Sequence, residues 1–145
     1  MKKLIVVRIK GLVGVPNKIK RTLELLRLKK KFSCVIVDDT KEKLGMLKKV
    51  KSYVAFGYVK PETVEKLLLK RAKKGKKKVT LDEKKVKEFV SKFMENKARL
   101  SELNIDPVFH LHPPRGGFKK STKLEWPKGV LGKNEKINEL VERML

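Results

Sequence analysis

Three short apolar runs, at residues 4–9, 34–37 and 53–59, constrain most strongly how this chain can fold. They are rich in β-branched and aromatic side chains, which favours strands over helices. Between them, residues 19–26 and 44–47 carry apolar side chains at helical spacing. Strand, helix, strand, helix, strand with such short connections predicts an α+β fold, in which a small three-stranded sheet carries its helices on one face.

Local signals support this pattern. Pro16 suits the first position of the first helix, because its fixed φ and missing N–H are tolerated there. The Asp38, Asp39 and Thr40 side chains are good N-caps for the second helix. The single cysteine, Cys34, sits inside an apolar run and has no second cysteine to pair with, so we predict a buried thiol.

Residues 60–145 read as an extension with more helix than strand. Pro61 opens a helix, and Thr80 with Glu83 forms a capping box before a helix whose apolar face includes Phe89 and Phe93. Residues 108–112 read as one further short strand. Residues 123–133 read as irregular, and Asn134 is placed to cap a final helix with the apolar stripe Ile137, Leu140, Val141 and Met144.

The charge of the chain indicates the class of its partner. Among 145 residues, 39 are Lys or Arg and 16 are Asp or Glu, which gives a net charge of +23. Such self-repulsion would be relieved by a polyanion, so nucleic acid is the leading candidate. The sequence has no run of eighteen apolar residues and no signal-peptide pattern, so we expect a cytoplasmic protein without a membrane partner.

Two segments concentrate positive charge outside the predicted helices and strands. Residues 70–78 hold seven Lys or Arg and no acidic residue, which predicts a loop that orders on RNA or a solvated surface stretch. In residues 113–120, two prolines stiffen the chain and Gly116 and Gly117 leave the backbone bare. Arg115 then offers a planar fork for phosphate or a guanine edge, and Lys119 and Lys120 add charge.

Two other functions are compatible with part of the sequence. A metal-dependent nuclease would need His110, His112, Asp38 and Asp39 as ligands, but adjacent aspartates point in different directions and no third ligand has ligand spacing. A basic DNA-binding or chromatin architectural protein shares the charge but would be expected to show a helix-turn-helix, zinc or heptad signature, and none is seen.

The sequence also resembles a known family. Residues 4–59, with Gly14-Val15-Pro16, Val37-Asp38-Asp39-Thr40 and 45–50, resemble the whole of the short bacterial ribosomal protein L-thirty. Phe56-Gly57-Tyr58, residues 112–117 and the terminal residues 137–144 are similar to the longer archaeal form and to eukaryotic L-seven. This chain lacks the long basic N-terminal arm of the eukaryotic proteins.

The resemblance implies a ferredoxin-like core at residues 1–59, mainly antiparallel, and an archaeal or eukaryotic-type extension at residues 60–145 that packs on it. It further implies binding to large-subunit ribosomal RNA near the five-S RNA, ribosomal-protein neighbours, and no catalysis, cofactor, metal or small-molecule substrate. The family's RNA-facing loop and helix start map onto residues 10–21, and its proline-arginine-glycine loop onto residues 112–120.

Charge, spacing and resemblance together select a set of candidate RNA-binding residues. We expect most of them to contact phosphates, because they are mainly lysines and the few aromatic residues lie in core-like stripes. The set is Arg8, Lys10, Lys18, Lys20, Arg21, Lys73, Lys74, Lys76, Lys77, His112, Arg115, Gly116, Gly117, Lys119 and Lys120.

Overall fold

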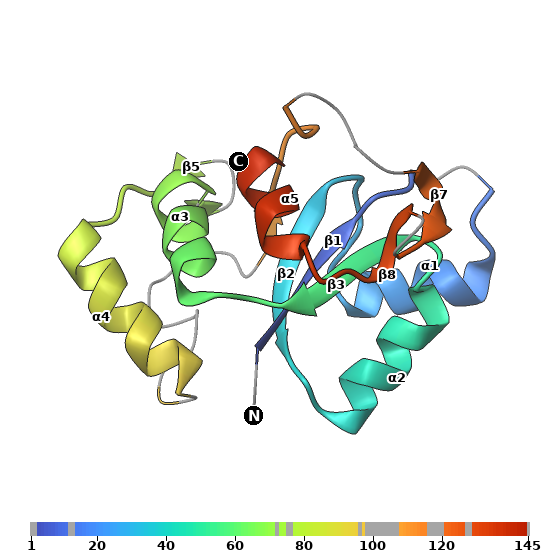
Figure 1. The fold of residues 1–145 in the computed structure, drawn as a ribbon, viewed down its shortest axis with the longest axis horizontal. Helices are drawn as coiled ribbons and strands as arrows, with labels where there is room; N and C mark the ends of the chain where they lie inside the picture. Colours follow the sequence, from blue (N-terminus) through green and yellow to red (C-terminus); the bar gives the residue numbers. More distant parts are fainter. Residues whose placement is uncertain are drawn as a thin grey trace.

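The computed structural model describes residues 3–11, 14–71, 73–74, 77–95, 97, 108–115, 121–126 and 129–144 (Figure 1). The helices are α1 (Asn17–Leu25), α2 (Lys41–Val50), α3 (Pro61–Arg71), α4 (Glu83–Met94) and α5 (Ile137–Met144). The strands are β1 (Lys3–Arg8), β2 (Ser33–Asp38), β3 (Val54–Tyr58), β4 (Lys73–Lys74), β5 (Lys77–Lys78), β6 (Val108–His110), β7 (Ser121–Glu125) and β8 (Gly129–Lys133).

The main sheet has the order β6-β2-β1-β3-β8-β7. β1 pairs antiparallel with both β2 and β3, and β6 pairs antiparallel with β2. β8 joins the other side, parallel to β3. The α+β class and the antiparallel three-stranded core β2-β1-β3 are therefore confirmed, as is the strand near residue 108.

The prediction that residues 123–133 are irregular was wrong, because β8 and most of β7 lie there. β8 carries only two apolar residues, Val130 and Leu131, between glycines and a lysine. Such a segment has little intrinsic preference for a strand, and its pairing with the edge of β3 supplies the conformation.

Both faces of the sheet are covered. On one face Leu4 and Val6 of β1 pack into an apolar cluster with residues of α1 and α2, including Leu23 and Leu47. On the other face Ile5 and Val7 pack with residues of α3, α4 and α5. The helices of the first 59 residues thus share one face, as predicted, and the later helices cover the opposite face (Figure 1).

Cys34 is fully buried, as predicted, and burial raises the pKa of its thiol. The Thr40 hydroxyl accepts a hydrogen bond from Lys43 N at 3.3 Å and caps α2. At α4, however, Asp82 is the N-cap in place of Thr80, and its carboxylate accepts from Lys84 N at 3.1 Å. Aspartate is at least as good a cap as threonine and lies nearer the first apolar residue.

The basic stretch 70–78 is not simply a loop. Lys70 and Arg71 complete α3, and β4 pairs antiparallel with β5, with Lys73 opposite Lys78 and Lys74 opposite Lys77. Residues 73–74 and 77–78 are therefore strands, which corrects the predicted loop at these positions.

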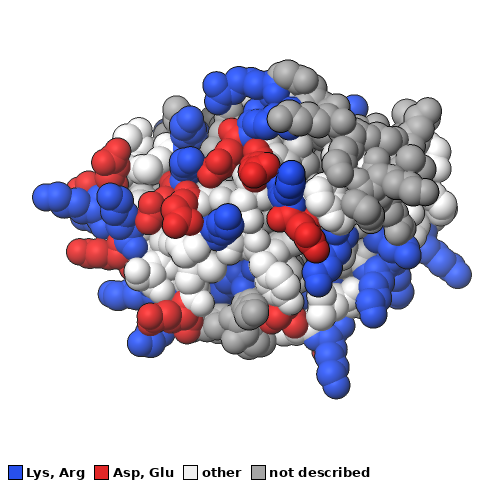
Figure 2. All heavy atoms as spheres, viewed as in Figure 1, with Lys and Arg blue, Asp and Glu red and all other residues white. Residues whose placement is uncertain are grey.

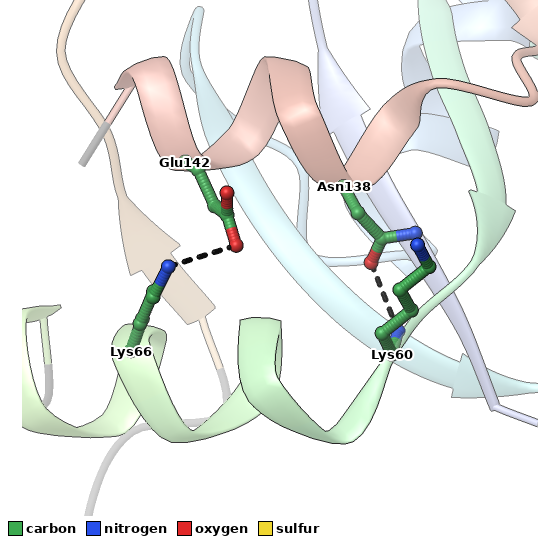
Figure 3. A network of polar contacts seen from close by, with 4 residues as sticks. All are labelled: Lys60, Lys66, Asn138 and Glu142. Atoms are coloured by element: carbon green, nitrogen blue, oxygen red, sulfur yellow. Dashed lines mark hydrogen bonds and ion pairs between the residues drawn. The ribbon is translucent and has the colours of Figure 1, made fainter.

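Hydrogen bonds and an ion pair hold the terminal helix α5 against the end of β3 and against α3 (Figure 3). The Asn138 carbonyl oxygen accepts from Lys60 N at 2.9 Å, and its amide donates to Tyr58 O at 3.0 Å. Lys66 and Glu142 form an ion pair of 3.1 Å between the exposed sides of α3 and α5. Asn134 accepts from Lys136 N at 2.8 Å in the turn that opens α5, which agrees with its predicted capping role.

Gly57 allows the start of α5 to lie close to β3. A Cβ atom there would lie 2.6 Å from Asn134 O and 2.8 Å from Ile137 Cγ2. Both distances are shorter than van der Waals contact, and the first atom belongs to the backbone, which cannot rotate away. The absence of a side chain at this position is therefore required for α5 to pack on β3.

Replacing Gly57 with alanine is expected to lower the free energy of unfolding by about 1–3 kcal/mol, because the added methyl group overpacks the β3–α5 contact. Urea denaturation of the free protein measures this. Gly45→Ala is the matched control: it lies in α2, where a Cβ meets nothing within 4 Å, so it should stabilise by about 0.5–1 kcal/mol. Unchanged stability in Gly57→Ala would contradict the proposed packing constraint.

Candidate nucleic-acid interface

The exposed side of α1 is cationic. Lys18, Lys20 and Arg21 are all exposed, while Leu23 faces the core. Lys20, Arg21 and Lys29 line a shallow open hollow on this side of the helix, together with one carboxylate, Glu24. Figure 2 shows Lys and Arg gathered along the lower right of the molecule, over α1 and α2, and Asp and Glu mainly over the left and centre. The structure thus brings three of the predicted RNA-binding residues to one solvent-facing helix.

Arg8 does not belong to this exposed surface. Its side chain is 1% exposed, and its guanidinium donates to three carbonyl oxygens: Lys10 O at 3.0 Å, Leu28 O at 2.7 Å and Gly11 O at 3.3 Å. Burial lowers the pKa of Arg8, which stays protonated at neutral pH. We therefore correct the prediction that Arg8 contacts RNA: it holds the backbone of two basic segments from inside.

Lys10 lies in the first of these segments. It is half-buried, and its ammonium lies 5.5 Å from the centre of the Tyr53 ring. A cation over an aromatic face is attracted by the ring quadrupole. Lys10 is thus held beside β3 at the end of β1, with part of its surface open to solvent.

The second segment is the turn after α1, for which the lysine run predicts only the end of the helix. Arg27 N donates to Glu24 O at 2.9 Å and Leu28 N to Leu23 O at 2.8 Å, the two bonds of a Schellman cap. Arg27 has φ 65°, the left-handed conformation that glycine adopts without cost. Arg27, Lys29 and Lys30 are exposed there. In the sequence, the run Lys29-Lys30-Lys31 is the feature that could have indicated this exposed basic surface.

Residues 112–115 are fixed to the end of α5. His112 N donates to Met144 O at 3.0 Å and Arg115 N donates to Arg143 O at 3.0 Å. The Arg143 guanidinium in turn donates to Arg115 O at 3.1 Å. These bonds satisfy carbonyls at the end of a helix that have no partner within it. The His112 and Arg115 side chains remain exposed.

The predicted set also includes residues away from α1. Gly116, Gly117, Lys119 and Lys120 lie outside the described residues, as does Lys76. Lys77 is exposed in β5, and Lys73 and Lys74 form β4. The helix α1 and residues 111–115 appear in different parts of Figure 1, so the described members of the predicted set do not form one patch.

The described residues do not form the metal site that a nuclease would need. Among the described residues, no group of three or more His, Cys, Asp or Glu side chains is placed to hold a metal ion. Asp38 forms an ion pair with Lys3, its partner across the β1–β2 pairing. His110 and His112 are exposed while Phe109 and Leu111 are buried, which is the alternation predicted for this strand. Within the described part of the chain, no helix is both long and apolar enough to span a bilayer.

Changing Arg8 to lysine is expected to destabilise the fold by about 1–3 kcal/mol, because an ammonium cannot reproduce the planar fork and would leave buried carbonyls without donors. Urea denaturation measures the difference. Lys20→Ala removes an exposed charge and should stay within about 0.5 kcal/mol of the parent protein. Equal stability of the parent and Arg8→Lys would show that the three carbonyl contacts do not hold the fold.

Comparison with known proteins shows the family of this chain. Residues 4–54 match the family model described as ribosomal protein L30p/L7e. The chain is 43% identical to the large ribosomal subunit protein uL30 of Archaeoglobus fulgidus over 96% of this chain and 97% of the relative. It is 41% identical to the Staphylothermus marinus protein of that name over 97% and 96%, and 43% identical to that of Cenarchaeum symbiosum over 97% of both. This chain is therefore a member of the L30p/L7e family of ribosomal proteins.

Proposed function

We propose that this protein is a structural constituent of the large ribosomal subunit and binds large-subunit ribosomal RNA. The exposed cationic side of α1 is the observation that carries the proposal, since Lys18, Lys20 and Arg21 offer charge on a rigid helix. Full-length similarity to archaeal proteins named for the large subunit supports it. The protein acts in the cytoplasm, as part of the subunit.

Binding is mainly through phosphates. Lysines supply most of the exposed charge, and as point charges they suit phosphate contact more than base discrimination. The phenylalanines Phe56, Phe89, Phe93 and Phe109 are buried, so they offer no stacking surface to bases. The protein therefore recognises the shape of folded RNA, with its register set by Lys10 and α1 on one side and Arg115 on another.

The remaining predicted contacts belong to the same proposal. Residues in the segments 73–77 and 112–120 add further phosphate contacts to those of α1. This second set consists of Lys73, Lys74, Lys76, Lys77, His112, Gly116, Gly117, Lys119 and Lys120. Residues 1–59 form the RNA-binding core and residues 60–145 an extension that packs on it, near the five-S RNA and beside other ribosomal proteins.

The protein has no catalytic role in this proposal and takes no cofactor or small-molecule substrate. Its contribution is to hold RNA segments in position. Duplex DNA that displaced ribosomal RNA at equal mass would instead favour the DNA-binding alternative.

The affinity for large-subunit ribosomal RNA is expected to fall steeply with salt. If about 6–10 phosphates are neutralised, raising monovalent salt from about 50 to 200 mM should weaken binding by roughly 10³–10⁵ through counterion release. Filter binding across a salt series measures the slope, with duplex DNA of equal mass as the competitor control. A flat affinity over this range would contradict phosphate-directed binding.

Arg115→Ala is expected to weaken RNA binding about tenfold and to leave thermal unfolding of the free protein unchanged. The bonds that anchor residue 115 involve its backbone, and its side chain is exposed. Arg143→Ala is the comparison variant, because it removes the guanidinium that holds Arg115 O, so its melting temperature should fall. A lower melting temperature for Arg115→Ala would mean that this arginine holds the fold instead of contacting RNA.

A further inference from the structure

A second hollow lies on the face of the sheet where α1 ends. Its volume is about 490 Å³, within the range of pockets that take a small ligand. Three cationic side chains, Arg27, Lys29 and Lys30, and one carboxylate, Glu24, line it together with Ser33, Val108 and His110. Among these, only Glu24 carries negative charge, so the hollow favours an anion.

Ser33 supplies an independent sign of a ligand. The residue is 1% exposed, and its hydroxyl has no hydrogen-bond partner among the described residues. A buried hydroxyl without a partner is unfavourable and needs an explanation. Ser33 lies opposite His110 in the β2–β6 pairing, so both side chains are on the same face of the sheet. The two polar groups therefore adjoin each other on the wall of the hollow.

The cationic side of the hollow is held in an uncommon backbone conformation. Arg27 and Phe32 are the non-glycine residues of the described chain with positive φ, each at 65°. They bracket the segment that carries Lys29 and Lys30. At a position with positive φ, arginine is no more stabilising than glycine, so the fold alone does not explain an arginine at residue 27. The Arg8 guanidinium holds this segment through Leu28 O, and Arg8 O accepts from Phe32 N at 2.8 Å.

The charge and the polar groups of the hollow favour one kind of ligand, a nucleotide. A phosphate would pair with Arg27 and Lys30, while an unpaired base or ribose would lie against Val108 and find hydrogen-bond partners in Ser33 and His110. Protein recognition of RNA favours such unstacked nucleotides, which side chains can reach. Arginine gives a planar fork that matches the phosphate oxygens.

We infer that this hollow binds a single unpaired ribonucleotide of the RNA, with Arg27 as the phosphate ligand and Ser33 as the polar contact to the nucleoside. The inference rests on the proposed function for the identity of its natural partner. It adds to α1 a site that selects an unpaired nucleotide by shape.

The first experiment titrates the ¹⁵N-labelled protein with adenosine 5′-monophosphate and follows backbone amide shifts. We expect saturable shifts at residues 27–33 and 108–110. Inorganic phosphate alone should shift the amides of residues 27–30 and leave those of residues 108–110 unmoved. Shifts spread evenly over exposed lysines would overturn the inference, as would equal effects of phosphate and nucleotide on all these residues. Tighter binding of a phosphoserine peptide at these residues would overturn the assignment to RNA.

The second experiment uses variants that keep the fold. Arg27→Gly removes the guanidinium and places glycine where φ is positive, so stability should be unchanged or higher. Ser33→Ala removes a hydroxyl that has no partner among the described residues. Each should lower affinity for large-subunit ribosomal RNA about tenfold. Lys87→Ala, an exposed lysine on α4, loses the same charge as Arg27→Gly and should change affinity less than about twofold.

The two proposals fail in distinguishable ways. If the parent protein binds the RNA and both hollow variants match Lys87→Ala, the nucleotide site is wrong and the proposed function stands. If the parent protein does not bind the RNA, the proposed function is wrong, and the nucleotide titration still decides whether the hollow takes a ribonucleotide.

Discussion

The central strand β1 is the constraint on which the rest of the structure depends. All of its residues are buried, and its four consecutive apolar side chains alternate between two separate clusters. A continuous apolar strand has no solvent-facing side, so the sheet needs a layer on each face. α1 and α2 provide one layer. The helices α3, α4 and α5 provide the other, so their buried faces are part of the core.

This layering also determines where charge can go. The apolar stripes of α1 and of α3 to α5 face the sheet, and their lysines and arginines are therefore on the outside. The acidic residues are few and lie mainly over α3 to α5 in Figure 2. On the face shown in Figure 2, the charged residues over α1 and α2 are consequently mainly Lys and Arg.

The sequence predicted the parts of the fold in which one local pattern decides the outcome. The β-branched runs of β1 to β3 and the apolar spacing of α1, α2 and α4 each specify an element without outside help. β8 could not be predicted, because its two apolar residues, flanked by glycines, become a strand only beside β3. The same distinction applies to the candidate RNA-binding residues. The exposure of the α1 lysines follows from the helical periodicity of the sequence. Arg8 could not be distinguished from those lysines, because its three acceptors lie in two segments that come together only in the folded chain. The conformation of Arg27 likewise depends on how α1 ends.

The Arg8 guanidinium has a consequence for recognition. It joins the backbone at Lys10 and Gly11 to that at Leu28, so the two segments that flank α1 are ordered together when the protein folds. Their conformational entropy is lost at that step and not during association with RNA. A buried arginine can in this way increase affinity for an anion that it never touches, by preorganising the groups that do.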